Sequence, residues 1–202
     1  TLYTAMPRPT RLETEPTVSQ DSEYIVKQSI YNILKSIGEN PDREGLLDTP
    51  KRVAKSYKEI FGGYEQNVDD ILTTFQNEGY DEMVTLRDIE FYSTCEHHML
   101  PFMGTAHISY IPSEKIVGLS KLARVLDVYS KRLQVQERLT TQVADILLEK
   151  LKPKGVAVML EAKHFCMLCR GARKQNSKMI TTSLKGVYNK PEVRAEFLHS
   201  IR

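Results

Sequence analysis

The sequence is short of cysteine, of excess charge and of long apolar runs, and each shortage excludes a class of protein. Three cysteines in 202 residues are odd in number and lack the spacing of a disulfide framework, so we expect a reducing compartment, by default the cytoplasm. Lys and Arg number 28 against 26 Asp and Glu, which argues against a dedicated nucleic-acid or membrane-surface protein. No apolar run approaches the ~20 residues of a membrane helix, and no secretory signal, internal repeat or low-complexity segment is visible.

The chain divides into three parts by composition. Residues 1–20 contain three prolines and few apolar anchors, which predicts a disordered tail. Residues 21–83 predict a helical arm, because apolar residues recur at helical spacing up to Gly38 and again after Thr49-Pro50, a proline-initiated helix start. At 41% hydrophobic residues, the 202-residue chain can form one domain with its own core plus an appendage.

Residues 84–202 are expected to form this domain, with α+β architecture. Short β-rich runs come first, two amphipathic helices follow, and further β-rich runs come last, which favours a four-stranded antiparallel sheet with both helices on one face. The expected strands are 84–92, 105–111, 156–168 and 178–188, and the expected helices are 119–129 and 137–151.

Six of the eight cysteines and histidines lie in two short windows, 95–98 and 164–169. Thiolate and imidazole are the ligands that zinc prefers. In the first window, Cys95 and His98 are three residues apart in a tight stretch before Pro101. This spacing allows both side chains to converge on one ion from a turn, so the sequence predicts a metal site.

The second window separates two kinds of zinc site. Side chains alternate along a strand, so in an extended segment His164 and Cys166 point to one side and Cys169 to the other. A site of Cys95, His98 and Cys166 leaves its fourth position open to water, as in catalytic zinc sites. The addition of Cys169 would close the site and make it structural. We favour the open site and keep the closed one as the alternative.

His97 and His164 are left over beside the proposed ligands. Imidazole titrates near pH 6.5, so both histidines could act as general acids or bases next to a zinc-activated water. The alternative for each is a structural, hydrogen-bonded role. His107 and His199 have no such neighbours in the sequence, and we interpret them as structural.

Basic residues recur in pairs that suit a polyphosphate. Lys121 and Arg124 share a face near the start of an expected helix, where free N–H groups favour anions. Arg170 follows the second window, and Arg52 with Lys55 repeats the spacing in the arm. A solvated helix face is the alternative for any single pair.

These segments, taken together, closely resemble GTP cyclohydrolase I over residues 22–202. The matching stretches are CEHHMLPF at 95–102, GLSKLAR at 118–124, RLQVQERLT at 132–140, HFCM at 164–167 with RG at 170–171, NSK at 176–178, and EGLLDTPKRVAK at 44–55. Their number and order make a chance match implausible.

The resemblance implies an activity and a metal. The activity would be hydrolysis and rearrangement of GTP to 7,8-dihydroneopterin triphosphate with release of formate, the first step towards folate or tetrahydrobiopterin. The metal would be one zinc ion per subunit, with Cys95, His98 and Cys166 as ligands, in agreement with the open site. His97 and His164 would move protons while the imidazole ring of guanine opens.

The resemblance also implies how the substrate is bound. Ser120 would assist opening of the ribose. Further residues would contact the guanine or hold the triphosphate: Gln136 and Glu137 for the guanine, and Lys121, Arg124, Arg170, Arg52 and Lys55 for the triphosphate.

For the assembly, the resemblance implies the tunnelling fold and an allosteric homodecamer of two pentamers, in which subunits share active sites. The sequence identifies no regulatory protein or feedback ligand.

Two other interpretations of the sequence remain. A sister family of this fold reduces a cyano-deazaguanine base with a catalytic cysteine and a nicotinamide cofactor, and bound zinc would discriminate against it. A zinc-stapled oligomeric binding protein without turnover would have no need of His97, His164 and Ser120.

Overall fold

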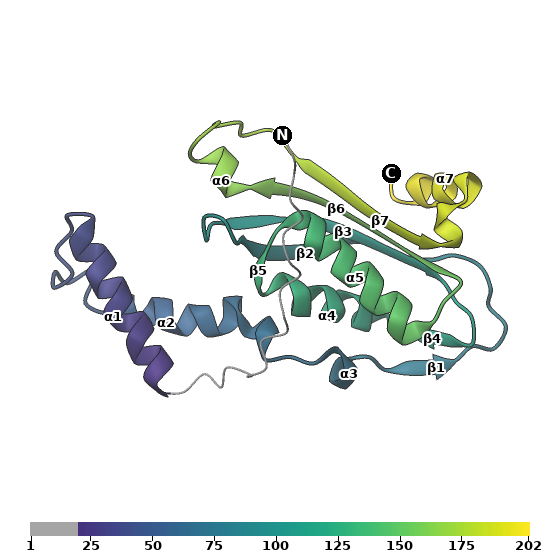
Figure 1. Cartoon of the computed structure of the whole chain (residues 1–202), viewed down its shortest axis with the longest axis horizontal. Coiled ribbons are helices and arrows are strands. Elements are labelled where there is room, and N and C mark those ends of the chain that lie inside the picture. The colour runs from purple at the N-terminus through teal and green to yellow at the C-terminus, as the bar shows by residue number, and fades with distance from the viewer. Residues whose placement is uncertain (1–19) are drawn as a thin grey trace, which may run out of the picture. The chain divides into compact units, whose positions relative to one another are not determined.

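The computed structural model describes residues 20–202 (Figure 1). The chain divides between Tyr57 and Lys58 into two compact units. The expected tail at 1–20 lies outside the described residues, except Gln20, which begins the first helix. The division falls before residue 83, the expected end of the arm, because the chain after Lys58 already bonds within the second unit. For example, the Gly63 N–H donates to the Lys131 carbonyl at 3.1 Å.

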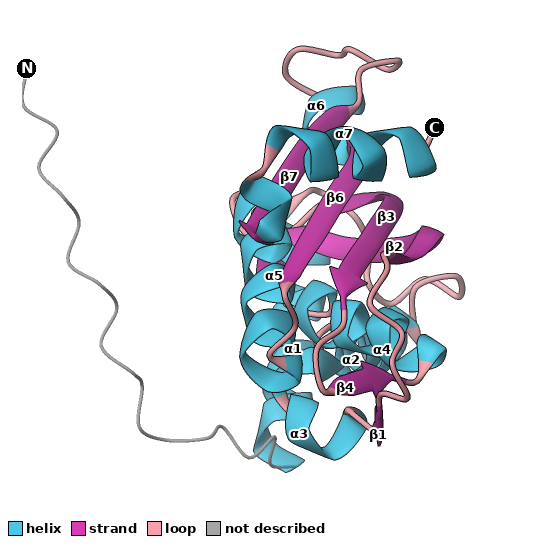
Figure 2. Cartoon of the chain, turned by 90° about the vertical axis from the view of Figure 1, so that its right-hand side faces the viewer, coloured by secondary structure: helices cyan, strands magenta, loops and turns pink. Residues whose placement is uncertain are grey.

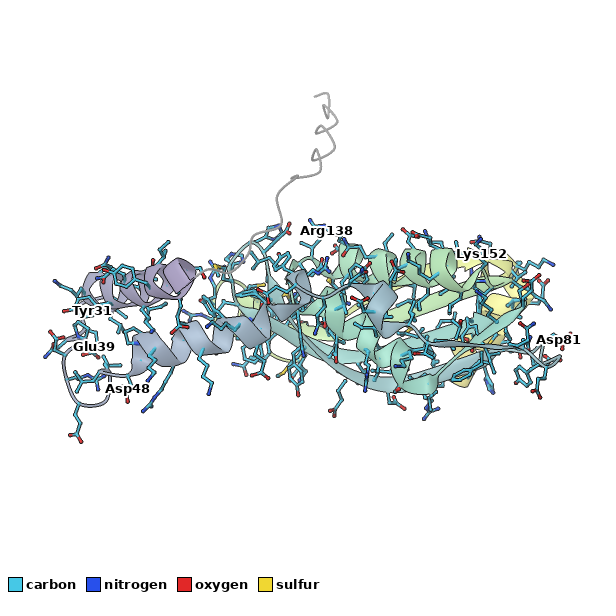
Figure 3. All side chains as sticks on the ribbon, turned by 90° about the horizontal axis from the view of Figure 1, so that it is seen from below. Tyr31, Glu39, Asp48, Asp81, Arg138 and Lys152 are labelled. Carbon is cyan, nitrogen blue, oxygen red and sulfur yellow. The ribbon has the colours of Figure 1, made fainter. Side chains whose placement is uncertain are left out.

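The first unit contains helix α1 (Gln20–Ser36) and most of α2 (Thr49–Ile60). α1 ends at Ser36, just before the predicted stop at Gly38, whose φ of 86° lies in the left-handed region that glycine tolerates. In the connecting loop, the Arg43 guanidinium donates to both carboxylate oxygens of Glu39 at 3.0 and 2.9 Å, which lowers the pKa of Glu39 to about 2. Figure 3 labels Glu39 in this loop.

The second unit is built on a five-stranded sheet in the order β5-β2-β3-β6-β7. The four long strands are antiparallel, as predicted, and the two-residue β5 adds a parallel edge that the sequence pattern did not reveal. β1 and β4 form a separate two-stranded sheet, also not predicted. The strands are β1 (Thr74–Gln76), β2 (Val84–Cys95), β3 (Pro101–Ile111), β4 (Lys115–Val117), β5 (Leu133–Gln134), β6 (Gly155–His164) and β7 (Met179–Gly186).

Helices α4 (Leu119–Ser130) and α5 (Gln136–Leu151) pack on one face of this sheet, as predicted. Their apolar stripes, represented by Leu122 and Leu139, are fully buried against alternate sheet residues such as Phe102 and Leu160. Each such side chain contributes roughly 1.5–3 kcal/mol by burial. The core of the unit therefore lies between these helices and the sheet.

A further helix, α7 (Pro191–Ser200), packs on the opposite face (Figure 2), and the sequence analysis did not predict it. Phe197 from α7 and Tyr188 are fully buried with Ala157 of β6. Ala157 points away from its strand neighbours Val156 and Val158, which face α4 and α5. The remaining short elements are the helical turns η1 (Gly62–Tyr64), α3 (Val68–Ile71), α6 (Phe165–Leu168) and η2 (Val187–Asn189).

The two ends of the sheet differ in the chain segments that they carry. At the first, which we call the Cys95 end, β2 finishes at Cys95, β3 begins at Pro101 and β6 finishes at His164. At the second, the Ile111 end, β3 finishes at Ile111 opposite Gly155.

Helix α4 connects these two ends. It begins at the Ile111 end, directly after β4, where the Val117 N–H donates to the Tyr110 hydroxyl at 3.2 Å. It finishes at the Cys95 end, where the following β5 pairs with Thr94 and Cys95. Twelve helical residues span about 18 Å, so the first turn of α4 lies about 12–16 Å along the helix axis from the end that reaches the Cys95 end of the sheet.

Candidate metal centre

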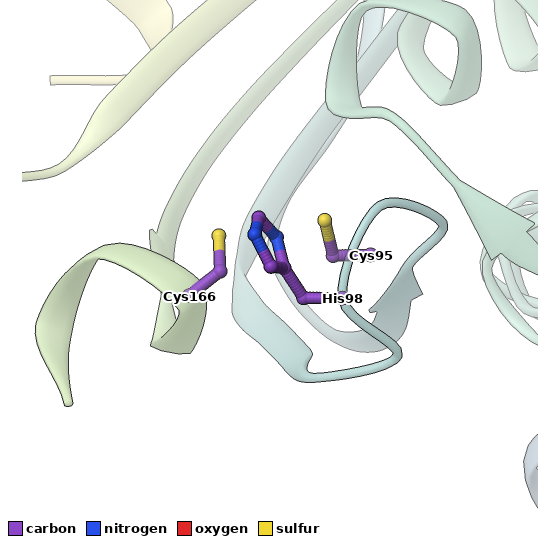
Figure 4. Close-up of side chains that lie close together, drawn as sticks. All are labelled: Cys95, His98 and Cys166. Carbon is purple, nitrogen blue, oxygen red and sulfur yellow. The ribbon is translucent and has the colours of Figure 1, made fainter. Parts of the chain in front are cut away.

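Three side chains at the Cys95 end form a cluster that could bind a metal (Figure 4). The Cys95 and Cys166 thiols and a ring nitrogen of His98 lie within 4.8 Å of one another. Cys95 is buried at the last position of β2, His98 is exposed in the turn after it, and Cys166 is half-buried in α6. These are the three residues that the sequence analysis selected.

The turn from Cys95 to Leu100 is held by its own backbone. The Cys95 N–H donates to the Leu100 carbonyl and the Met99 N–H donates to the Cys95 carbonyl, both at 2.8 Å. Met99 adopts a φ of 52° to close the turn, a conformation that is uncommon outside glycine. The local backbone therefore brings Cys95 and His98 to the same side.

Glu96 ties this turn to helix α5. Its N–H donates to the Gln134 carbonyl at 3.0 Å, and the Arg138 guanidinium donates to both of its carboxylate oxygens, at 2.9 Å for the longer contact. Arg138 is labelled in Figure 3. These charge-assisted bonds hold the pKa of Glu96 below its usual range. A partly exposed bidentate pair of this kind contributes about 1 kcal/mol at most, so its main effect is to orient the turn.

The sequence analysis selected Cys166 for a reason that the structure overturns. β6 ends at His164, so Cys166 does not share a strand face with it but lies in the single helical turn of α6. The expected strand 156–168 was wrong in its last four residues, and strand parity does not apply to Cys166. Cys169 follows α6, is exposed, and donates its thiol hydrogen to the Phe165 carbonyl at 3.0 Å. It is not part of the cluster.

The donor set fits a zinc ion. Burial and the neighbouring Cys95 thiol raise the pKa of Cys166, because two thiolates so close together repel each other. A divalent cation between them would remove this repulsion and favour both thiolates. Two sulfur atoms and one imidazole nitrogen match the ligands of zinc, and three protein ligands leave a fourth position for water or substrate.

The two spare histidines have different surroundings. His97 is exposed on the turn, and its ring meets that of His98 edge to face at 6.4 Å. His164 is half-buried and stacks on Phe102, with ring centroids 4.6 Å apart and planes within 3°. Burial lowers the pKa of His164, and the nearby Glu137 carboxylate partly offsets this shift.

Gln136 contacts His164 from the first position of α5. Its side chain is fully buried, and its Oε1 lies 2.7 Å from His164 Nε2. The next residue, Glu137, is exposed. Of the two residues expected to contact the guanine, only Glu137 therefore presents its side chain to solvent.

Arg170 is the one expected triphosphate ligand that lies at the cluster. Its Nη1 donates to His98 Nε2 at 3.1 Å. Arg52 and Lys55 are exposed on α2 in the first unit, where Arg52 pairs with Asp48 at 3.5 Å.

Ser120, Lys121 and Arg124 lie in the first two turns of α4, at the Ile111 end of the sheet. α4 runs towards Cys95, and along its axis Ser120 and Lys121 lie about 14–15 Å, and Arg124 about 9 Å, from the end nearer the cluster. Their side chains form no hydrogen bond or ion pair with any other residue in the described range.

The sequence analysis missed three features of the site. Arg138 lies inside a recognised motif, but its pairing with Glu96 spans 42 positions and no local signal indicates it. The bond between Gln136 and His164 is likewise long-range. α6 (Phe165–Leu168) has no local signal either, because the glycine and basic residues that disfavour a strand come only after Cys169.

The fold and cluster define a class of protein: an α+β protein with a Cys-His-Cys cluster that could bind a metal, flanked by two further histidines. Comparison with known proteins gives the family. The family model for GTP cyclohydrolase I matches residues 26–202. The chain therefore belongs to the GTP cyclohydrolase I family, a family of hydrolases.

Curated relatives cover nearly the whole chain. A protein named GTP cyclohydrolase 1 from Bartonella quintana (strain Toulouse) is 54% identical over 88% of this chain and 87% of its own. Proteins of the same name from Streptomyces avermitilis and Dehalococcoides mccartyi (strain ATCC BAA-2100) are 50% and 52% identical. They cover 97% and 89% of this chain and 98% and 97% of their own.

A solved structure of archaeosine synthase QueF-Like in the apo form is also similar, with a TM-score of 0.44 and 14% identity over 55% of this chain and 97% of that one. We draw nothing about function from a likeness at this level. No helix in the described part of the chain is long and apolar enough to cross a membrane.

Proposed function

We propose that this protein uses zinc to convert GTP to 7,8-dihydroneopterin triphosphate with release of formate, the first step towards folate or tetrahydrobiopterin. One observation carries the proposal: Cys95, His98 and Cys166 converge within 4.8 Å in a chain of the GTP cyclohydrolase I family. One zinc ion per subunit would be held by these three residues. When bound, zinc supplies Lewis-acid activation of a water molecule.

The chain's own residues would handle protons at the reacting base. His97, exposed on the turn, would exchange protons with solvent and substrate while C8 of guanine is hydrolysed and released as formate. His164, half-buried and oriented by Phe102 and Gln136, would exchange protons in a fixed ring orientation. General acid–base groups of this kind contribute about 10²- to 10⁴-fold to rate.

Two side chains near the cluster would bind opposite parts of GTP. Glu137 would accept hydrogen bonds from the guanine N–H groups through its exposed carboxylate. The Arg170 guanidinium has donors suited to phosphate oxygens and lies beside His98. Arg52 and Lys55 of the helical unit are further candidates for the triphosphate.

Ser120, Lys121 and Arg124 would complete the site of a neighbouring copy. The direction of α4 supports this proposal, because along the helix axis Ser120 and Lys121 lie about 14–15 Å and Arg124 about 9 Å from its Cys95 end. A homodecamer of two pentamers, with shared sites and allosteric regulation, would bring these residues to the cluster of a neighbouring copy. The free edge of β7 in the sheet order is available for pairing between copies. We propose a cytoplasmic location from the reduced cysteines.

The test is a product assay on metal-stripped and reloaded protein. We expect zinc-loaded protein and GTP to yield formate and a fluorescent pterin in equal amounts. We expect no product after treatment with a chelator, and recovery when zinc, but not magnesium, is restored. ATP in place of GTP controls for non-specific nucleotide hydrolysis. Absence of both products from zinc-loaded protein would overturn the proposal and favour a zinc-stapled binding protein.

A further inference from the structure

The Gln136 side chain is buried at the Cys95 end and hydrogen-bonded to the surrounding residues. It is the first residue of α5 and is 0% exposed. A buried amide needs partners for its oxygen and for both N–H groups, because an unpaired one costs about 1–3 kcal/mol. The identity of those partners fixes which way the amide points.

The amide nitrogen faces the sheet. Gln136 Nε2 lies 3.2 Å from the Leu160 carbonyl oxygen, 3.0 Å from that of Met179 and 3.1 Å from Thr181 Oγ1. Backbone carbonyl oxygens only accept hydrogen bonds, so an NH2 group must face them. The reversed amide would place oxygen against two carbonyl oxygens. Oε1 therefore faces His164.

Two threonines complete the network without ambiguity. The Thr140 hydroxyl donates to the Gln136 carbonyl at 2.7 Å, so its only hydrogen is used. In the 2.7 Å contact between Thr140 and Thr181, Thr181 must then be the donor. Its oxygen stays available to accept from Gln136, so all three groups around Nε2 are acceptors and share the two hydrogens of the amide.

This arrangement specifies the proton on His164. Gln136 Oε1 can only accept, so His164 Nε2, 2.7 Å away, carries a hydrogen. A neutral imidazole has one N–H, which leaves the lone pair on Nδ1. The parallel ring of Phe102 fixes the plane of His164, so Nδ1 also has one direction.

We propose that Gln136 is a positioning residue that holds His164 as the Nε2–H tautomer, so that proton exchange with substrate takes place at Nδ1. The consequence for turnover rests on the proposed function; the tautomer does not. This role replaces a direct contact between the Gln136 side chain and the guanine.

The tautomer can be measured without turnover, by solid-state NMR of the zinc-loaded protein carrying ring-¹⁵N histidine. The chain has five histidines, and the His164 signals are assigned by their loss in His164→Asn. We expect an unprotonated Nδ1 and a protonated Nε2. A proton on Nδ1 of neutral His164 would overturn the proposal.

Gln136→Met separates positioning from substrate binding, since it keeps the volume and removes the amide. We expect the Nε2–H preference to be lost and kcat to fall roughly 10- to 1000-fold, with KM for GTP changed less than about twofold. A raised KM with an unchanged tautomer would instead indicate a guanine contact and contradict the proposal. Gln136→Glu keeps an acceptor oxygen for His164 but sets its second oxygen against the Leu160 and Met179 carbonyl oxygens, so it should not restore the wild-type rate.

Gln142→Met is the matched control, because Gln142 lies on the same helix with its side chain bonded to Gln134 at 2.8 Å, and it is not a partner of His164. We expect the His164 tautomer and the kcat of this variant to match those of wild type. If wild type shows the Nε2–H tautomer but makes no pterin, the proposed function fails while the positioning role of Gln136 stands. If wild type makes pterin but neutral His164 carries its proton on Nδ1, only the positioning role of Gln136 fails.

Discussion

The two ends of the sheet carry two sets of functional candidates that are held in different ways. At the Cys95 end, side chains are oriented by defined partners: Arg138 holds Glu96, and Gln136 and Phe102 hold His164. At the Ile111 end, Lys121 and Arg124 extend from the first turns of α4 without such partners among the described residues. The Cys95 end is preorganised within a single chain. The Ile111 end presents charged groups and hydrogen-bond donors that have no partner in the described part of their own chain.

The largest expected effect separates metal binding from proton transfer at the Cys95 end. Cys95→Ala removes a ligand, so we expect zinc to be lost and formate production to fall by at least about 10³-fold. His97→Ala leaves the cluster intact, so we expect full zinc content and a kcat about 10²- to 10⁴-fold lower. Zinc content is measured by elemental analysis and turnover by formate release.

His199→Ala is the control for these two variants. His199 is an exposed histidine near the end of α7, on the face of the sheet opposite α4 and α5, and its replacement should change neither quantity. Loss of zinc from His97→Ala in proportion to its loss of activity would show that His97 is a ligand and would contradict the division of roles.

A smaller effect tests whether the two ends combine between copies. Cys95→Ala damages only the Cys95 end and Arg124→Ala only the Ile111 end, so each homogeneous protein should turn over poorly. If a site takes one end from each of two copies, refolding a 1:1 mixture should give about a quarter of the sites with both ends intact. Formate release from the mixture should therefore exceed that of either variant alone.

Recovery must come from mixed assemblies, so the two variants carry different affinity tags and are purified through both. Tandem-purified protein with no more activity than the better parent would contradict shared sites. It would then require Arg124 to act within its own chain or to have no part in substrate binding.

The long elements could be predicted because they carry a repeated pattern. Apolar residues spaced around Leu122 and Leu139 indicate α4 and α5, and the four main strands follow from β-rich runs. The three ligand candidates follow from residue type and spacing, since cysteine and histidine so concentrated in two windows have few other uses, and the structure brings them together. α7 was missed although it contains the buried Phe197, because its apolar residues do not form a stripe along one side.

The parts that could not be predicted depend on contacts between distant residues. β5 has two residues, too few for any periodicity, and exists because it pairs with the end of β2. The roles of Arg138 and Gln136 follow from bonds to Glu96 and His164 that only the folded chain brings together. Cys166 was selected by a parity argument that assumed a continuous strand. The structure nevertheless places Cys166 beside Cys95 and His98, because α6 turns its side chain towards them.

X-ray absorption at the zinc edge of the purified protein tests the open three-ligand site most directly. The account predicts two sulfur neighbours at about 2.3 Å, one imidazole nitrogen at about 2.0–2.1 Å and one further light atom from water. It also predicts an unchanged spectrum for Cys169→Ala, because the Cys169 thiol donates to the Phe165 carbonyl outside the cluster. Three sulfur neighbours, reduced to two by Cys169→Ala, would show a closed structural site and contradict the account.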